Sequence, residues 1–322
     1  MMSIRKPLMA IMAACIATAS MVSTVQSATF PSKGVTAICP WSAGGGTDTI
    51  LRALARNAEP FLGENITVIN KTGGGGAIGH TVGVNARPDG YSVMMITFEV
   101  LSVPPQGMVP WTYKDFDLLM RVNMDPAAIT VHADAPYNTI EEFVAYAKAN
   151  PKKIKVGHAG PGSVWQLAGS IFAENTDIEL AYVPFDGGAP AVTALVGNHI
   201  DAVSVSAAEV QAQVKAGNLK ILGVMSDERI GIFPGVPTMK ESGFDVSFGT
   251  WRGLGVPKNT PEEAKIVLRD AFKQGMETAD FKKFANNAGL GLAYLNAEDW
   301  AKLMAIDSKS VTKTMKLLGL AK

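Results

Sequence analysis

Four glycine-containing segments carry the clearest chemical signal in the sequence, because a helical pattern follows each of them directly. They cover residues 42–47, 73–79, 160–163 and 186–188, and none contains Lys or Arg. The first turn of a helix exposes unpaired backbone N–H groups and carries roughly half a positive charge, so it can receive a carboxylate or phosphate without a basic side chain. The four segments therefore predict an anion-binding site built from backbone amides.

Each of these loops also has a purely structural interpretation. Glycine permits tight turns with positive φ, and Asp48 and Ser163 would then act only as helix caps. For any single loop this interpretation is at least as good as the binding hypothesis. Four loops at the same topological position favour binding.

Dinucleotide binding is a competing hypothesis. Residues 74–79 satisfy G-x-G-x-x-G, and Glu99 follows twenty residues after Gly79. However, these glycines follow the second predicted strand instead of the first, and a run of four glycines matches the pattern easily. An NAD-binding oxidoreductase is therefore the weaker alternative.

Signatures of catalysis and of metal binding are missing from the sequence. It has no Walker loop, no H-E-x-x-H and no G-x-S-x-G, and its four histidines lack ligand spacing. No residue near Ser163 in sequence is a candidate base that would activate it as a nucleophile. We therefore expect a binding protein, not an enzyme, with no catalytic residues, no metal and no cofactor.

Three tryptophans border the glycine loops. Trp41, Trp165 and Trp251 could each provide a flat wall for the apolar part of an organic acid. Core packing is an equal interpretation for Trp165, and Trp111 and Trp300 are expected to be structural.

The elements that must position these residues follow from the apolar periodicity. Strand-like runs alternate with helical patterns, which predicts an α/β fold whose parallel strands bring their following loops to one edge. The expected strands cover residues 35–39, 66–70, 91–97, 128–131, 155–157, 201–206 and 219–225. The expected helices cover residues 48–58, 77–86, 140–149, 164–174, 189–196, 261–278, 279–287 and 297–317.

Composition indicates a globular protein without a nucleic-acid partner. Lys plus Arg and Asp plus Glu both total 29, so no net charge draws the chain to a polyanion. Hydrophobic residues make up 47% of the 322 residues, and this length predicts about two domains.

The first 27 residues have the features of a secretory signal peptide. Arg5 and Lys6 precede an apolar stretch, and residues 25–27 provide a small-residue cleavage site. Lipidation at Cys15 is a minor alternative. If Cys15 is removed with the leader, Cys39 is the remaining cysteine. It lies in an apolar run, where we expect a buried thiol.

Six sequence blocks together resemble a known family. They are PWSAGGGTD at 40–48, residues 70–79, RPDGY at 87–91, VPFDGGAPA at 183–191, PGVPT at 234–238 and WRG at 251–253. In content, order and spacing they are similar to solute-binding proteins of the tripartite tricarboxylate transporter family. The resemblance implies a type II-like periplasmic binding protein with two lobes, each a mostly parallel sheet flanked by helices, and a ligand in the cleft.

The resemblance also implies a function and partners. Such a protein captures a small organic acid, commonly a di- or tricarboxylate, and delivers it to one large and one small membrane subunit. A monomer in the periplasm is expected, and a role as a ligand sensor that docks on a membrane protein stays open.

The resemblance places the ligand between the glycine loops. One acid group is expected on the amides of residues 43–45, with ordered water, and the other end of the ligand on the second lobe. Many family members have Lys at the position of Asp186 and His at that of Gln166, so the ligand's identity stays open. The expected binding residues are Trp41, Ser42, Ala43, Gly44, Gly45, Thr47, Asp48, Gly76, Thr97, Gly162, Ser163, Gln166, Phe185, Gly187, Ser206 and Trp251.

Two chain crossovers are expected between the lobes. We place them near residues 123–126 and 247–250, since hinges are usually a few residues between elements. The first lobe would then comprise residues 28–124 and 250–322, and the second lobe residues 125–249.

Overall fold

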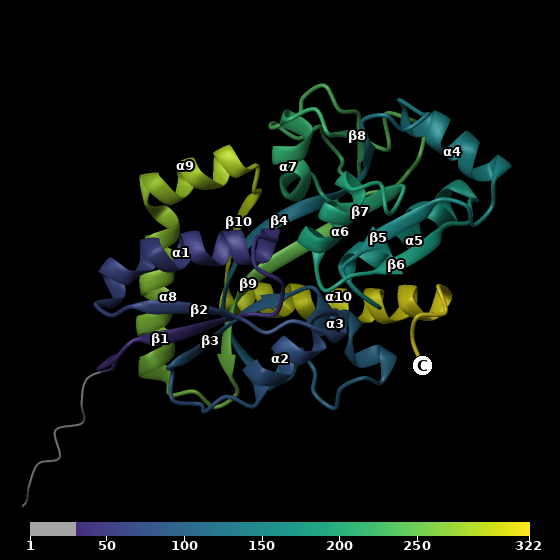
Figure 1. Ribbon diagram of the computed structural model, residues 1–322. Helices are drawn as coiled ribbons and strands as arrows, with labels where there is room; N and C mark the ends of the chain where they lie inside the picture. The colour runs from purple at the N-terminus through teal and green to yellow at the C-terminus, as the bar shows by residue number, and fades with distance from the viewer. Residues whose placement is uncertain (1–29) are drawn as a thin grey trace, which may run out of the picture.

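The strands of the protein form a mixed sheet system shared between two lobes. The computed structural model describes residues 30–322, so the predicted signal peptide and Cys15 lie outside the described residues. Ten strands follow the order β2-β1-β3-β9-β4-β7-β5-β6, with β8 and β10 also paired to β4. Helices flank the strands in both lobes, which confirms the predicted α/β class (Figure 1).

The first lobe contains three parallel strands, each followed by a helix that begins near the carboxyl end of its strand. Its strands β1 and β3 are almost wholly buried, which explains their uniformly apolar sequences. A short 3-10 turn of three glycines leads into the second helix. In chain order these elements are β1 (Val35–Cys39), α1 (Gly46–Leu62), β2 (Ile66–Asn70), η1 (Gly74–Gly76), α2 (Ala77–Val84), β3 (Ser92–Thr97) and α3 (Glu99–Ser102).

The second lobe repeats this arrangement. Three parallel strands are again each followed by a helix, and a fourth strand, β8, pairs antiparallel with β4. In chain order its elements are α4 (Ile140–Ala149), β5 (Lys155–His158), α5 (Val164–Thr176), β6 (Ala181–Pro184), α6 (Gly188–Val196), β7 (Ala202–Ser206), α7 (Ala207–Lys215) and β8 (Leu219–Val224).

Two long strands connect the lobes. β4 (Phe116–His132) pairs antiparallel with β9 (Gly249–Pro257) as far as Pro126, and beyond that point it pairs with β7 and β8. Two short 3-10 turns, η2 (Pro104–Gln106) and η3 (Tyr113–Asp115), precede it. One strand therefore belongs to both lobes.

The predicted strand at 128–131 was too short, because β4 begins twelve residues earlier. The missed part contains Arg121, Asn123 and Asp125, which interrupt the apolar pattern although all three are buried. Hydrogen bonds to distant parts of the chain compensate Arg121 and Asp125, and no local pattern reports such partners.

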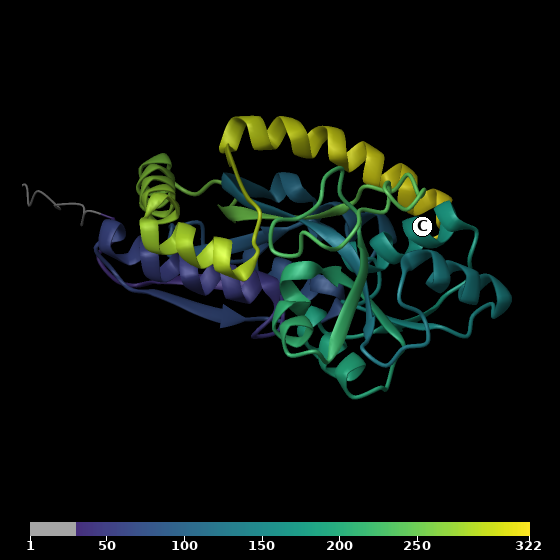
Figure 2. The same cartoon turned by 90° about the horizontal axis from the view of Figure 1, so that it is seen from above.

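The C-terminal segment returns to the first lobe, as predicted. α8 (Glu262–Glu277) lies against α1, and at Gly275 an added Cβ would lie 2.8 Å from the backbone of Ala58. α9 (Ala279–Ala288) and β10 (Leu292–Asn296) follow. α10 (Ala297–Leu317) runs along one side of the molecule and packs against α3 and β4 (Figure 2).

Within residues 30–322, no helix combines the length and apolarity needed to cross a bilayer. Five strands and helices of this range were not predicted: β6, β9, β10, α3 and α7. A signal for α7 was present, since Ser206 and Glu209 form the S-x-x-E capping box that marks a helix start.

Candidate functional site

A small cavity lies where helix starts of the two lobes meet. The space open to the centre of a water molecule is about 20 Å³, which is enough for ordered water but not for an organic acid. Both lobes and the connecting strand β9 contribute to its wall. The lining residues are Trp41, Ser42, Gly45, Gly46, Thr47, Glu99, Ala159, Val164, Trp165, Gly188, Glu209, Thr250 and Arg252.

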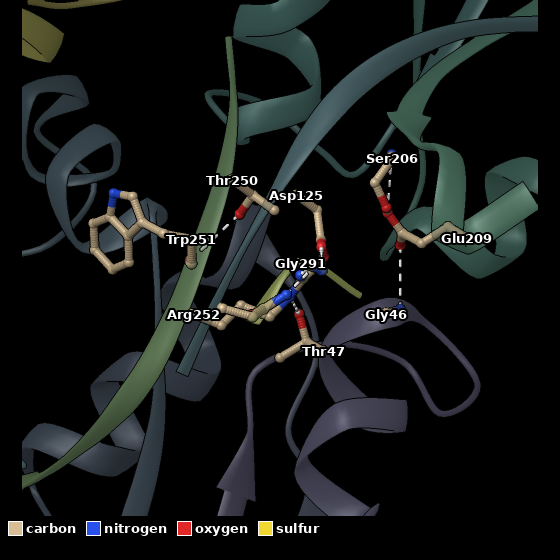
Figure 3. Close-up of polar contacts among 10 residues, drawn as sticks. Gly46, Thr47, Asp125, Ser206, Glu209, Thr250, Trp251, Arg252 and Gly291 are labelled. Atoms are coloured by element: carbon tan, nitrogen blue, oxygen red, sulfur yellow. Dashed lines mark hydrogen bonds and ion pairs between the residues drawn. The ribbon is translucent and has the colours of Figure 1, made fainter. Parts of the chain in front are cut away.

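Arg252 joins the connecting strands to the start of α1. Its Nε donates to Thr47 Oγ1 at 2.9 Å, and its Nη1 donates to Asp125 Oδ2 at 2.5 Å (Figure 3). Asp125 Oδ1 in turn accepts from the Gly291 amide at 2.9 Å. The side chains of this ion pair are only 3% and 2% exposed, so the guanidinium is already neutralised inside the protein.

Glu209 reaches from the second lobe to the first turn of α1. Its Oε2 accepts from Ser206 Oγ at 3.2 Å within the capping box, and its Oε1 accepts from the Gly46 amide at 3.3 Å (Figure 3). Burial raises the pKa of the Glu209 carboxyl, while the nearby Arg252 charge acts in the opposite direction. A carboxylate of the protein therefore already lies at the start of α1, next to the amides of residues 43–45 that were expected to hold a ligand's acid group.

Glu99 makes the reciprocal contact from the first lobe to the second. Its Oε1 accepts from the Val164 amide, at the first residue of α5, at 2.8 Å, and its Oε2 accepts from Thr97 Oγ1 at 2.5 Å. The residue is 1% exposed, and burial raises the pKa of its carboxyl, against the effect of the Thr97 and Val164 hydrogen bonds. Each lobe thus sends one glutamate to a helix start of the other.

The first glycine loop uses part of its amides for its own geometry. Gly44 N donates to Asp48 Oδ2 at 3.0 Å, and Gly45 N donates to the carbonyl of Ser42 at 3.3 Å. Asp48 also accepts from Arg52 Nε at 2.9 Å. Burial alone would raise the pKa of Asp48, but these hydrogen bonds and charges lower it below the ordinary value. Asp48 does not line the cavity, and Ala43 and Gly44 are exposed.

The predicted residues at the start of α5 are also engaged locally. Ser163 caps the helix by accepting from Gln166 N at 3.2 Å, and Gln166 Oε1 accepts from Gly162 N at 2.6 Å. The carbonyl of Gly162 accepts from Ser102 Oγ at 2.6 Å, which is a further contact between the lobes.

Ser42 and Gly187 face each other across the lobes. Gly187 has φ +133°, and an added Cβ would lie 2.6 Å from Ser42 Oγ, so a side chain there would meet the first loop. Within the described part of the chain, the buried Ser42 hydroxyl has no hydrogen-bond partner. Phe185 is half-buried beside Gly157.

His80 fixes the second glycine loop. Its Nδ1 lies 2.8 Å from the carbonyl of Gly76, and Thr97 N donates to its Nε2 at 3.3 Å. The ring of Trp41 covers Gly76, and Trp41 Nε1 donates to Thr97 Oγ1 at 3.4 Å. Gly76 and Thr97 therefore support the cavity wall from behind Trp41.

Trp165 lines the cavity, and Trp251 does not. Trp251 packs edge-to-face on Trp300, with ring centroids 5.4 Å apart. Because successive side chains of a strand point to opposite faces, Thr250 and Arg252 face the cavity while Trp251 faces the core (Figure 3). The expectation that Trp251 provides the flat wall does not agree with this placement.

Cys39 is buried as expected, and burial raises the pKa of its thiol to about 12.

The dinucleotide hypothesis receives no geometric support. An added Cβ on Gly75 would lie 2.5 Å from the carbonyl oxygen of Pro161, so the second glycine loop is packed against the other lobe instead of open to a pyrophosphate. Glu99 is bound to the α5 start and not placed as a ribose ligand. Among residues 30–322, no group of three or more His, Cys, Asp or Glu side chains is arranged to hold a metal ion.

Sequence and structure comparisons identify similar proteins over nearly the whole chain. A family model described as tripartite tricarboxylate transporter family receptor matches residues 50–320. A Cupriavidus necator protein, described as UPF0065 protein in gbd 5'region, is 30% identical over 96% of this chain and 94% of its own length.

Solved structures agree with this result. A TctC solute-binding protein from Polaromonas, described as having no ligand, is 42% identical over 89% of this chain and 99% of its own, with a TM-score of 0.66. The periplasmic binding protein BugD is 30% identical over 91% and 100%, with a TM-score of 0.87. A Rhodopseudomonas palustris protein solved with adipate shares the fold at 21% identity, 91% and 99% coverage and a TM-score of 0.86.

Proposed function

The chain belongs to the tripartite tricarboxylate transporter receptor family, whose members are periplasmic solute-binding proteins, and on this premise we propose that it captures a small organic acid in the periplasm. The acid would bind between the lobes, and a di- or tricarboxylate is the expected class. The receptor would then pass it to the membrane subunits that the family description implies.

The observation that carries this proposal is the convergence of helix starts from two lobes on one cavity. The first turns of α1 and α5 direct their amides toward it, and these are the groups that bind carboxylates in proteins. The adipate held by the R. palustris protein of the same fold is consistent with this class of ligand.

Ligand entry requires the lobes to separate, because the cavity admits only water. We place the hinge where β4 and β9 cross together, at the pairs Asp125–Thr250 and Pro126–Gly249, with the lobes at residues 28–124 plus 250–322 and 125–249. The relative with 42% identity superposes less well than the one with 30%, and a difference in lobe position would account for this order.

The test is a binding screen of the protein purified from the periplasmic fraction. Thermal shift and calorimetry would compare adipate, malate, citrate, a monocarboxylate series and NAD. An acid present at 100 times its dissociation constant should add about 2.7 kcal/mol to the free energy of unfolding. A response to NAD with silence for every acid would replace this proposal with the oxidoreductase alternative.

A further inference from the structure

The first residues of α1 and α5, directly after the loops expected to hold a ligand's acid groups, hold carboxylates of the protein itself. Glu209, from the second lobe, accepts from the Gly46 amide of the first lobe at 3.3 Å. Glu99, from the first lobe, accepts from the Val164 amide of the second lobe at 2.8 Å. We call Glu99 and Glu209 the glutamate latch, since both contacts exist only when the lobes are together.

An acid ligand and the glutamate latch cannot use the same amides. A carboxylate at the Gly46 amide would occupy the position of Glu209 Oε1, and the cavity offers only about 20 Å³ to water centres. Adding the ligand without moving a glutamate would also bury another negative charge where Glu99, Glu209 and Asp125 already face one guanidinium, that of Arg252.

The two latch contacts differ in strength. The Glu209 contact is long, and the residue is only half-buried, whereas Glu99 is held by short hydrogen bonds on both oxygens. Glu209 also keeps its capping-box partner Ser206 within its own lobe if the contact with Gly46 breaks. The contact of Glu209 with Gly46 is therefore easier to break than the contact of Glu99 with Val164.

We propose, on the basis of the proposed function, that Glu209 is a built-in competitor for the acid ligand: it holds the lobes together by occupying the start of α1, and the ligand binds by displacing it. Glu99 is the second half of the same latch and holds the start of α5. The net free energy of acid binding is then the gain from the ligand contacts minus the loss of the Glu209 contact with Gly46, since each binding event breaks that contact.

This proposal predicts that weakening Glu209 strengthens acid binding. Glu209→Gln keeps the size of the side chain and an oxygen for the capping box but removes the charge, and Glu209→Ala removes the contact altogether. Loss of one charge-assisted hydrogen bond should tighten the binding of adipate or malate roughly tenfold in calorimetry. Glu174→Gln, on the exposed face of α5, is the matched control and should bind like the unchanged protein.

A second measurement needs no ligand. In small-angle X-ray scattering without any acid, Glu209→Gln, Glu209→Ala and Glu99→Gln should each have a larger radius of gyration than the unchanged protein and Glu174→Gln. Circular dichroism would verify that the variants are folded.

The outcomes separate this proposal from the proposed function. Unchanged radii of gyration in all three latch variants would refute the latch. Weaker binding of the acids by Glu209→Gln would also refute it, because Glu209 would then hold a hydrogen-bond donor of the ligand. If no acid binds any variant, the proposed ligand class is wrong, and the scattering comparison still decides whether the latch exists.

Discussion

The two buried histidines of the cleft region predict a loss of stability in mild acid. Burial lowers the pKa of both His80 and His158 to about 4, from an ordinary value of 6.5. Both are almost inaccessible, and the Nδ1 atoms lie 2.8 Å from the carbonyl of Gly76 and 3.0 Å from that of Gly160. Since Thr97 N donates to Nε2 of His80, that ring must be neutral with its proton on Nδ1.

The sign of the effect follows from proton binding. Below pH 6.5 the unfolded chain takes up a proton at each histidine that the folded protein refuses until about pH 4, so the free energy of unfolding falls as the pH falls through this interval. At 1.36 kcal/mol per pH unit, the full interval corresponds to roughly 3 kcal/mol per histidine, of which about 2 kcal/mol is lost by pH 5.

The two latch glutamates act in the opposite direction. Burial raises the pKa of both Glu99 and Glu209 above the ordinary value of 4.5. The folded protein therefore retains their protons longer than the unfolded chain does, and their contribution to stability is present below pH 4.5 and is lost as the pH rises through the raised pKa values. The decrease measured for the unchanged protein in acid is consequently smaller than the histidine contribution alone.

Urea unfolding at pH 8 and pH 5 separates the two contributions. Asn at position 80 or 158 can still donate to the carbonyl that the histidine contacts, but it does not titrate. The stability difference between the two pH values should therefore shrink by about 2 kcal/mol in His80→Asn and in His158→Asn. His199→Asn, at an exposed position, should leave it unchanged. The reasoning fails if both buried variants keep the full pH difference of the unchanged protein.

Two further predictions concern the packing that places the site. Asp125→Asn removes the carboxylate that is directly paired with the buried Arg252 guanidinium, so it should lower the free energy of unfolding by about 3–5 kcal/mol in urea titrations; a loss below about 1 kcal/mol would contradict a buried ion pair. Gly275→Ala should destabilise by about 1–3 kcal/mol despite the better helix propensity of Ala, because its Cβ would lie 2.8 Å from the Ala58 backbone. Gly231→Ala, in open space, is its control, and equal stability of the two variants would contradict this packing argument.

The elements that flank the glycine loops were predictable because their signals are local. The helices expected at 140–149 and 297–317 agree with α4 and α10 at both ends, since apolar periodicity and side-chain caps mark them. The first part of β4 was not predictable in this way. Its polar residues Arg121 and Asp125 are compensated by Ala293 and Gly291, which are far away in sequence.

The site was predictable only as a set of loops. Trp41, Ser42, Gly45 and Thr47 line the cavity, whereas the Asp48 carboxylate accepts a hydrogen bond from Gly44 N within its own loop. Glu99, Glu209 and Arg252 were missed as cavity residues because their roles depend on contacts between the lobes. For Glu209 the capping box was readable, yet nothing in the sequence reports that its second oxygen reaches α1.

The backbone amides of Gly46 and Val164 and the side chains of Glu209 and Glu99 together explain how this receptor can close without leaving these amides unpaired. If the lobes came together with no carboxylate present, the amides of Gly46 and Val164 would lose water and gain no partner, at a cost of about 1–3 kcal/mol each. Glu209 and Glu99 remove this cost, but both carboxyls are themselves withdrawn from water, and this desolvation raises their pKa values. A ligand therefore competes with carboxylates that the protein already contains. Its acid groups bind only if their interactions are more favourable than those of the glutamates that they replace.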